Sequence, residues 1–138
     1  MEAYLVATAC TKFEKKPDQS FKDLTEEVYC DLLKSAGVEN GDMIGQAWFG
    51  NCGMGTFGQN NIRGQVCFTP LVQKNLFPER VGIINVEGGC ATGSMAFHGA
   101  WKDIISGTED VSLAIGVEKI YQPDNPEKIQ EIYNGGID

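Results

Sequence analysis

Histidine and basic residues are scarce in this chain. Among its 138 residues there is one histidine, His98, and the 11 lysines and arginines are outnumbered by 19 acidic residues, for a net charge of −8. Phosphate groups are bound by clustered lysine and arginine, so this balance argues against a nucleic acid or an anionic membrane as a partner. No apolar run approaches the ~18 residues of a membrane-spanning helix, and no basic and apolar leader precedes the first expected element. We expect no membrane span.

Cysteine pairs of the C-x-x-C type are missing as well. The five cysteines are odd in number, which does not favour a disulfide framework, and their spacing provides no thiolate zinc site. Unpaired cysteines fit a reducing compartment. We therefore expect a cytoplasmic protein without a metal site.

Four short apolar runs have the pattern of strands that are buried on both faces, as in parallel sheets. The runs are residues 3–9, 44–49, 81–86 and 111–117. A chain of this length is expected to form one domain, so we place all four strands in one sheet.

A helix is expected between the first two runs. Ser20 is a candidate N-cap, Asp23 follows it by three residues, and Gly37 is a candidate for the residue that ends the helix. The apolar face of this helix at helical spacing consists of Leu24, Val28 and Leu32.

Two more helices are expected between the later runs. One covers about 65–76, although Pro70 weakens the pattern. The other covers 91–106 and ends at Gly107. The order β-α-β-α-β-α-β predicts an α/β fold with a parallel, doubly wound sheet and right-handed crossovers.

The helix over 91–106 is unusually rich in small residues and carries no charge before Lys102. A surface helix has a polar face along most of its length. We therefore expect protein to enclose this helix on nearly all sides.

Cys90 lies between the strand 81–86 and this helix, directly after Gly88 and Gly89. The position puts its sulfur beside a helix N-terminus, where unpaired N–H groups and the helix dipole favour the nucleophilic thiolate. The glycines permit a sharp turn and the close approach of a substrate. A small buried cysteine that only packs is the alternative.

A base for Cys90 is harder to find. His98 is eight positions further on in the same helix, or about 12 Å along the axis, and packing or surface exposure is its expected role. Glu87 is nearby, but a carboxylate opposes formation of a neighbouring thiolate. The chain thus has a candidate nucleophile and no convincing base.

A competing motif is "GMGTFG", residues 53–58, which fits the G-x-G-x-x-G form of a dinucleotide-binding turn. Glu79 or Glu87 would then bind the ribose. The helix that should receive the pyrophosphate starts late and contains Pro70. A flexible glycine loop is the alternative.

The remaining cysteines have neither the spacing nor the local histidine of ligands or nucleophiles. Cys10 and Cys30 are expected to pack, and Cys67 has no assigned role. Cys52 lies in the glycine loop and is expected to be accessible, without an assigned chemistry.

The segment "INVEGGCATGSMAFHGAWKDIISGTEDVSLAIGVEKI" resembles the nucleophile region of the thiolase superfamily. Its Thr92 and its Asn-Val lead-in are most similar to the sterol-carrier-protein type of thiolase. The segment "GQNNIR", residues 58–63, resembles the Gly-Gln-Asn-Pro-x-Arg segment of thiolases, with Asn61 in place of the proline. The resemblance covers nearly the whole chain.

This resemblance implies a thiolase fold, in which two similar halves are packed as layers of helix, sheet, helix, sheet and helix. It also implies an acyl-CoA C-acyltransferase in which Cys90 forms the acyl-enzyme and its own N–H helps to hold the thioester oxygen. The substrates would be coenzyme A thioesters, with no tightly bound cofactor. Residues 1–120 would be an incomplete N-terminal half-domain, and 121–138 the start of the region that covers the CoA site.

The family's activating histidine, second acid/base cysteine and oxyanion-hole histidine or asparagine match nothing in this chain, and neither does the fifth strand of the first half. The chain therefore resembles an N-terminal fragment or one subunit of a split assembly. The implied partners are a second copy, a C-terminal thiolase half or a small OB-fold protein. A non-catalytic thiolase-like subunit and a ketoacyl-synthase-like condensing enzyme are the alternatives.

Overall fold

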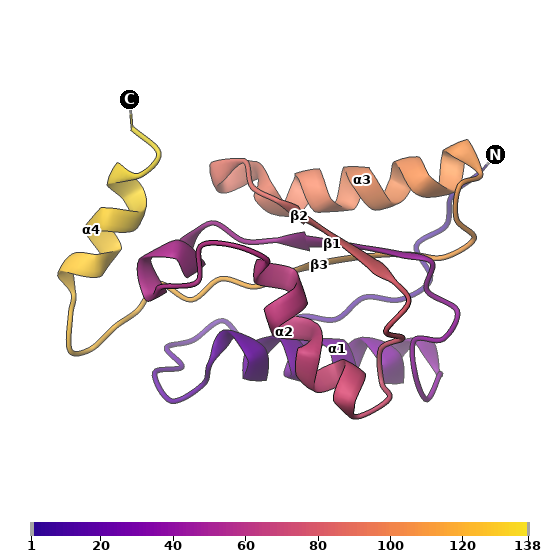
Figure 1. Cartoon of the computed structure of the whole chain (residues 1–138), viewed down its shortest axis with the longest axis horizontal. Helices are drawn as coiled ribbons and strands as arrows, with labels where there is room; N and C mark the ends of the chain where they lie inside the picture. Colours follow the sequence, from indigo (N-terminus) through magenta and orange to yellow (C-terminus); the bar gives the residue numbers. More distant parts are fainter. Residues whose placement is uncertain (1, 138) are drawn as a thin grey trace.

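The computed structural model describes residues 2–137 of the chain (Figure 1). Its sheet has three parallel strands in the order β2-β1-β3. The pairing aligns Gly50 with both Val86 and Gly116, so the three strands end at the same level. The predicted parallel α/β arrangement is confirmed over these strands, which are β1 (Gln46–Gly50), β2 (Gly82–Val86) and β3 (Ser112–Gly116).

Helices cover both faces of this sheet (Figure 1). The helices α1 (Phe21–Ala36) and α2 (Arg63–Gln73) lie on one face, and α3 (Thr92–Ser106) lies on the other, against β1 and β3. The helix α4 (Glu127–Asn134) stands apart from these layers.

Two short 3-10 helices follow strands at the same end of the sheet. The first, η1 (Gly53–Phe57), comes after β1 and contacts α4. The second, η2 (Gly89–Ala91), comes after β2 and leads directly into α3.

The predicted start and end of α1 are confirmed. Ser20 Oγ accepts the Asp23 N–H at 3.2 Å, and Asp23 Oδ2 accepts the Ser20 N–H at 2.8 Å, which is a capping box. The helix ends at Gly37 with φ +71°, a left-handed conformation that costs glycine little. The buried face of α1 is rotated slightly from the expected one and consists of Leu24, Thr25, Tyr29 and Leu33, with Val28 and Leu32 partly buried beside it.

The main core fills the space between the sheet and the helices α1 and α2. Tyr29, Phe49, Phe68 and Phe77 are buried there and meet edge to face. The Tyr29 hydroxyl donates to the Leu76 carbonyl at 3.0 Å, which satisfies its one polar group. Burial raises the pKa of Tyr29 well above its ordinary value.

The strand predicted over 3–9 is wrong. This segment has no strand pairing within the described residues, and Tyr4, Leu5 and Val6 are exposed. An apolar run becomes a strand only where a neighbouring strand accepts its backbone hydrogen bonds. The sheet therefore has one strand fewer than the sequence pattern indicated.

The expected burial of β2 is also wrong. This strand is at one edge of the sheet, and Gly82, Ile84 and Asn85 are exposed. An edge strand has a neighbour on one side only, so its burial is lower than that of β1.

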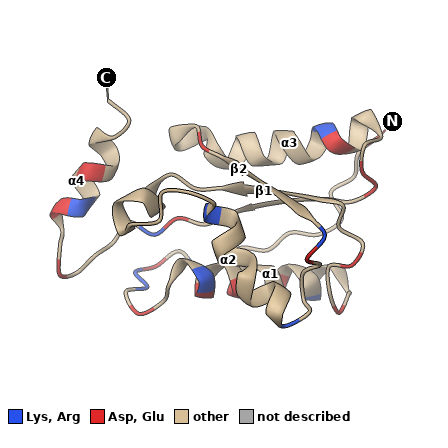
Figure 2. Cartoon of the chain, viewed as in Figure 1, with Lys and Arg blue, Asp and Glu red and all other residues tan. Residues whose placement is uncertain are grey.

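The expectation that protein encloses the helix α3 is not met within this chain. Only one face is buried, through Thr92, Ala96, Gly99 and Ala100. Outside this face Met95, Phe97 and Trp101 are between 41% and 55% exposed, and Phe97 and Trp101, four residues apart, are neighbours on the helix surface. Figure 2 shows no charged residue on α3 before its last turns, so the exposed part of this helix is uncharged over most of its length.

No helix among residues 2–137 combines the length and the apolar composition that crossing a membrane requires.

Candidate functional site

The loops that follow the three strands meet at one end of the sheet. Cys52, Gly88 and Glu118 each lie two residues beyond the last residue of their strand, which are Gly50, Val86 and Gly116 in turn. In parallel α/β sheets this end of the strands is where ligands bind. These three loops form the candidate site.

Cys90 occupies the turn between β2 and α3. It is a free, exposed cysteine in η2, immediately before the first turn of α3. Gly89 has φ +57°, which only glycine adopts readily, and the Ala91 N–H donates to the Gly88 carbonyl at 3.1 Å. The turn thus places Cys90 at a helix N-terminus, the position expected from the sequence, and its thiol is exposed. The role of Cys90 as nucleophile stays a prediction.

The buried hydroxyl of Thr92 makes two hydrogen bonds to the main chain of this turn. Its Oγ1 accepts the Gly88 N–H at 2.9 Å and donates to the Gly89 carbonyl at 2.7 Å. The methyl group of Thr92 packs against Gly50, where an added Cβ would come within 2.9 Å of it. The start of α3 therefore lies close to the end of β1.

Cys52 lies against the same turn, which the sequence did not indicate. Its Sγ is 3.1 Å from the Gly89 carbonyl oxygen and 3.0 Å from Thr92 Oγ1. The only available signal was its position, two residues beyond the end of the strand β1.

Glu118 holds the loop that carries Cys52. Its carboxylate accepts the N–H of Cys52 at 2.9 Å and the N–H of Gly53 at 3.1 Å, and it also accepts from Asn51 Nδ2 at 3.2 Å. Asn51 Oδ1 in turn accepts the Met54 N–H at 2.9 Å. Glu118 belongs to the Gly-x-Glu-Lys end of the thiolase-like segment, but the sequence indicates no role for it because its partners lie 65 to 67 residues away.

The hydrogen bonds of Glu118 and Asn51 argue against a dinucleotide-binding role for the G-x-G-x-x-G segment, residues 53–58. A pyrophosphate needs free N–H groups at the start of a helix, but the first N–H groups of this loop already bind the Glu118 carboxylate and Asn51. The helix α2 begins only at Arg63. The glycine segment is a 3-10 helix that holds the loop in place.

Among residues 2–137, no side chain that could act as a base makes a hydrogen bond to Cys90. His98 stacks on Trp101, with ring centroids 5.3 Å apart, on the exposed side of α3. Glu87 is exposed and makes no side-chain hydrogen bond within residues 2–137. Packing or surface exposure was expected for His98, and the residue is exposed.

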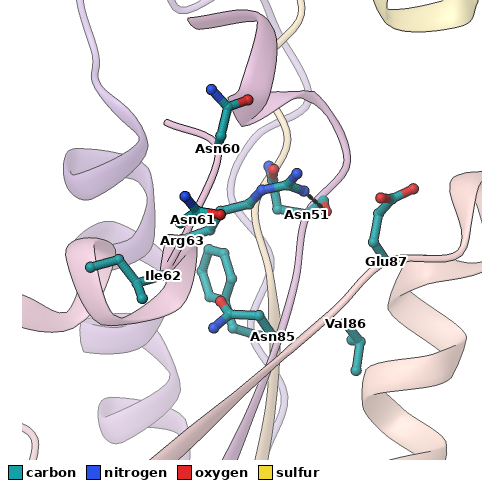
Figure 3. A pocket seen from close by; sticks show the side chains of 9 residues that line it. Asn51, Asn60, Asn61, Ile62, Arg63, Asn85, Val86 and Glu87 are labelled. Atoms are coloured by element: carbon teal, nitrogen blue, oxygen red, sulfur yellow. Dashed lines mark hydrogen bonds between the residues drawn. The ribbon is translucent and has the colours of Figure 1, made fainter. Parts of the chain in front are cut away.

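A polar cavity of about 260 Å³ lies beside the turn, between β2 and the loop that precedes α2 (Figure 3). Arg63 Nη1 donates to the Asn51 carbonyl at 2.8 Å at one wall, and Glu87 is at another. Ile62 has φ +46°, an unusual conformation for a β-branched residue. The other lining residues are Phe49, Asn60, Asn61, Asn85 and Val86.

The remaining cysteines differ in accessibility. Cys10 is exposed, so the expectation that it packs is wrong, whereas Cys30 is half-buried. Cys67 is fully buried, and burial raises the pKa of its thiol. Residues 2–137 contain no cluster of histidine, cysteine and carboxylate side chains that could hold a metal ion.

Fold and site together define an α/β protein with an exposed cysteine at a strand-to-helix turn. Residues 3–134 match the model of the thiolase N-terminal domain. The chain therefore belongs to the thiolase family, of which it represents the N-terminal part.

Curated relatives agree with this assignment. The chain is 32% identical over 117 residues to the benzoylsuccinyl-CoA thiolase subunit BbsB of Thauera aromatica, covering 85% of this chain and 28% of the relative. It is 32% identical over 111 residues to an acetyl-CoA acetyltransferase of Methanocaldococcus jannaschii, covering 80% and 26%. An acetyl-CoA acetyltransferase of Methanothermobacter thermautotrophicus is 29% identical over 116 residues, covering 84% and 29%. The chain thus spans little more than a quarter of the length of these relatives.

Proposed function

We propose that this chain is the nucleophile-bearing part of a thiolase-type acyl-CoA C-acyltransferase, in which Cys90 forms the acyl-enzyme. The reaction would be thiolytic cleavage of a 3-oxoacyl-CoA or the reverse Claisen condensation. In the condensing direction, Cys90 Sγ attacks the carbonyl carbon of an acyl-CoA, CoA leaves as its thiol, and the acyl group remains as a thioester on the protein. A second CoA-linked substrate then takes this acyl group.

The observation that carries the proposal is the exposed thiol of Cys90 at the start of α3, inside the segment that matches the thiolase N-terminal domain. Backbone N–H groups at a helix N-terminus can hold a developing oxyanion. The names of the relatives support CoA thioesters as substrates. No tightly bound cofactor is needed for this chemistry.

The chain needs a partner segment to complete this reaction. Its one histidine lies on the exposed side of α3, stacked on Trp101, so the base must come from elsewhere. The uncovered apolar face of α3 supports a C-terminal thiolase half as that partner. The exposed edge strand β2 is consistent with a homodimer. Residues 1–120 would then be the incomplete half-domain, and 121–138 the start of the region over the CoA site.

Mass spectrometry after incubation with acetyl-CoA tests the acyl-enzyme. The assembled enzyme should gain one acetyl group on the peptide that contains Cys90, and hydroxylamine should release it. Cys90→Ala should remove the adduct, whereas Cys10→Ala, which alters another exposed cysteine, should keep it. An active enzyme that carries the acetyl group on a different cysteine would contradict the proposal.

A second candidate is a non-catalytic thiolase-like subunit that binds acyl-CoA for a partner. The absence of a base beside Cys90 among the described residues favours it. Under this alternative, Cys90→Ala would leave both acyl-CoA binding and the activity of the assembled enzyme unchanged.

A further inference from the structure

The three loops at the end of the sheet are joined by one continuous set of hydrogen bonds. From this connection we infer that Glu118 is a positioning residue for Cys90 and acts through Cys52. The inference rests on the proposed role of Cys90 as nucleophile and extends it to residues on the other two strands.

The first link joins the end of β3 to the loop after β1. The Glu118 carboxylate accepts the main-chain N–H groups of Cys52 and Gly53 at 2.9 and 3.1 Å. Hydrogen bonds to a charged carboxylate are about twice as strong as those between neutral groups. Within residues 2–137 no lysine or arginine pairs with Glu118, so its acceptor capacity is directed to this loop. The backbone at Cys52 is therefore fixed from β3.

The second link joins Cys52 to the nucleophile turn. Its Sγ contacts both the Gly89 carbonyl and the Thr92 hydroxyl, at 3.1 and 3.0 Å. Gly89 is the residue directly before Cys90, so the orientation of its carbonyl fixes the peptide plane that includes the Cys90 N–H.

Gly89 itself has no packing restraint. A Cβ placed on Gly89 would meet no atom within 4 Å, so no packing holds this residue in its left-handed conformation. Its carbonyl accepts the main-chain N–H of Thr92, and the side chains of Cys52 and Thr92 supply its further contacts. Removing Glu118 or the Cys52 sulfur should let the turn move, and with it the thiol and the N–H of Cys90.

The test measures how fast iodoacetamide alkylates each cysteine of the chain, followed peptide by peptide with mass spectrometry. Exposed Cys10 serves as the reference for reagent and pH, and buried Cys67 reports unfolding. We expect Glu118→Gln to lower the rate at Cys90 at least threefold relative to Cys10, with Cys67 still protected. Cys52→Ala, which keeps the Glu118 carboxylate, should have the same effect.

Two comparisons separate positioning from other causes. Loss of negative charge near a thiol favours the thiolate and speeds alkylation, so Glu87→Gln should leave the Cys90 rate unchanged or raise it. Thr92→Val should slow Cys90, whereas Thr92→Ser, which keeps the hydroxyl, should stay within twofold of the natural chain.

An unchanged ratio of Cys90 to Cys10 labelling in both Glu118→Gln and Cys52→Ala would overturn the inference. So would labelling of Cys67 in these variants, because it would show that Glu118 and Cys52 only stabilise the fold. The assay uses no acyl-CoA, so a Cys90 that responds to Glu118 but accepts no acyl group would refute the proposed function and leave the positioning intact.

Discussion

The indole N–H of Trp48 donates a 2.7 Å hydrogen bond to Asp103 Oδ2, joining the central strand β1 to the far end of α3. The same carboxylate oxygen accepts the Ser112 hydroxyl of β3 at 2.7 Å. Beside this bond Gly99 lets α3 lie directly on the indole, where an added Cβ would come within 2.4 Å of Trp48 Cδ2. The position of α3 on the sheet depends on the packing of Gly99 against Trp48. The position of Cys90, just before the start of α3, depends on it as well.

Replacing Gly99 with alanine should destabilise the protein. The new methyl group would overlap the Trp48 ring, which is held by its hydrogen bond to Asp103, so α3 would have to shift. Overpacking of this kind typically costs about 1–3 kcal/mol in the free energy of unfolding. Urea unfolding followed by circular dichroism measures it.

Gly93→Ala is the matched control in the same helix. A Cβ there meets no atom within 4 Å, and alanine is a better helix former than glycine by about 1 kcal/mol. Its stability should be equal to or higher than that of the natural chain. A loss of stability in Gly93→Ala equal to that in Gly99→Ala would show that the contact with Trp48 is not the cause.

Asp103→Ala should also lower stability, because it leaves the Trp48 N–H without its acceptor and the Ser112 hydroxyl with only the Gln46 carbonyl at 3.4 Å. Unsatisfied groups of this kind cost about 1–3 kcal/mol. Thermal and urea unfolding provide the comparison. Asp110→Ala removes the same charge from an exposed residue that makes no side-chain hydrogen bond in the described part of the chain, and it should have little effect. Equal losses in the two variants would refute the structural role of Asp103.

The capping box of α1 predicts a pH-dependent contribution. Ser20→Ala should cost about 1 kcal/mol at neutral pH. Hydrogen bonds from the main-chain N–H of Ser20 and then from its hydroxyl hold the pKa of Asp23 below its ordinary value, and Ser20→Ala removes only the second of them. A carboxyl with a lowered pKa in the folded state stabilises the protein above its unfolded pKa, and this contribution is lost as the pH falls through the folded value.

The difference in the free energy of unfolding between the natural chain and Ser20→Ala should therefore become smaller below about pH 4, the ordinary pKa range of an aspartate. Urea unfolding at pH 7 and at pH 3 measures both differences. Ser35→Ala, near the exposed end of the same helix, should match the natural chain at both values. A difference in the free energy of unfolding that is larger at pH 3 than at pH 7 would contradict the stabilising role of this capping box.

Local features of this fold were readable from the sequence. The cap at Ser20 and the end at Gly37 are confirmed, because capping depends on residues a few positions apart. The strand-to-helix turn at Cys90 was equally visible, since its two glycines are adjacent to the helix they precede.

Features that depend on residues far apart in the sequence were either not predicted or predicted wrongly. Cys52 lies 37 residues from Gly89 in the sequence, and 66 residues from Glu118, so only the sheet register brings them together. The segment 3–9 has the composition of a strand, but within the described residues no neighbouring strand pairs with it. Composition alone does not specify a pairing partner.

The exposed apolar face of α3 predicts how the chain behaves in isolation. Exposed contiguous apolar surface drives association, and Phe97 and Trp101, four residues apart, are exposed neighbours on α3. Phe97→Ser should reduce self-association of the isolated chain, measured by sedimentation velocity across a range of concentrations. Phe13→Ser removes an equally large side chain that is fully exposed far from α3 in the sequence, and it should leave association unchanged. If both variants reduced association equally, general loss of hydrophobicity would explain the result and the face of α3 would have no special role. If neither did, α3 would not be the surface through which the chain associates.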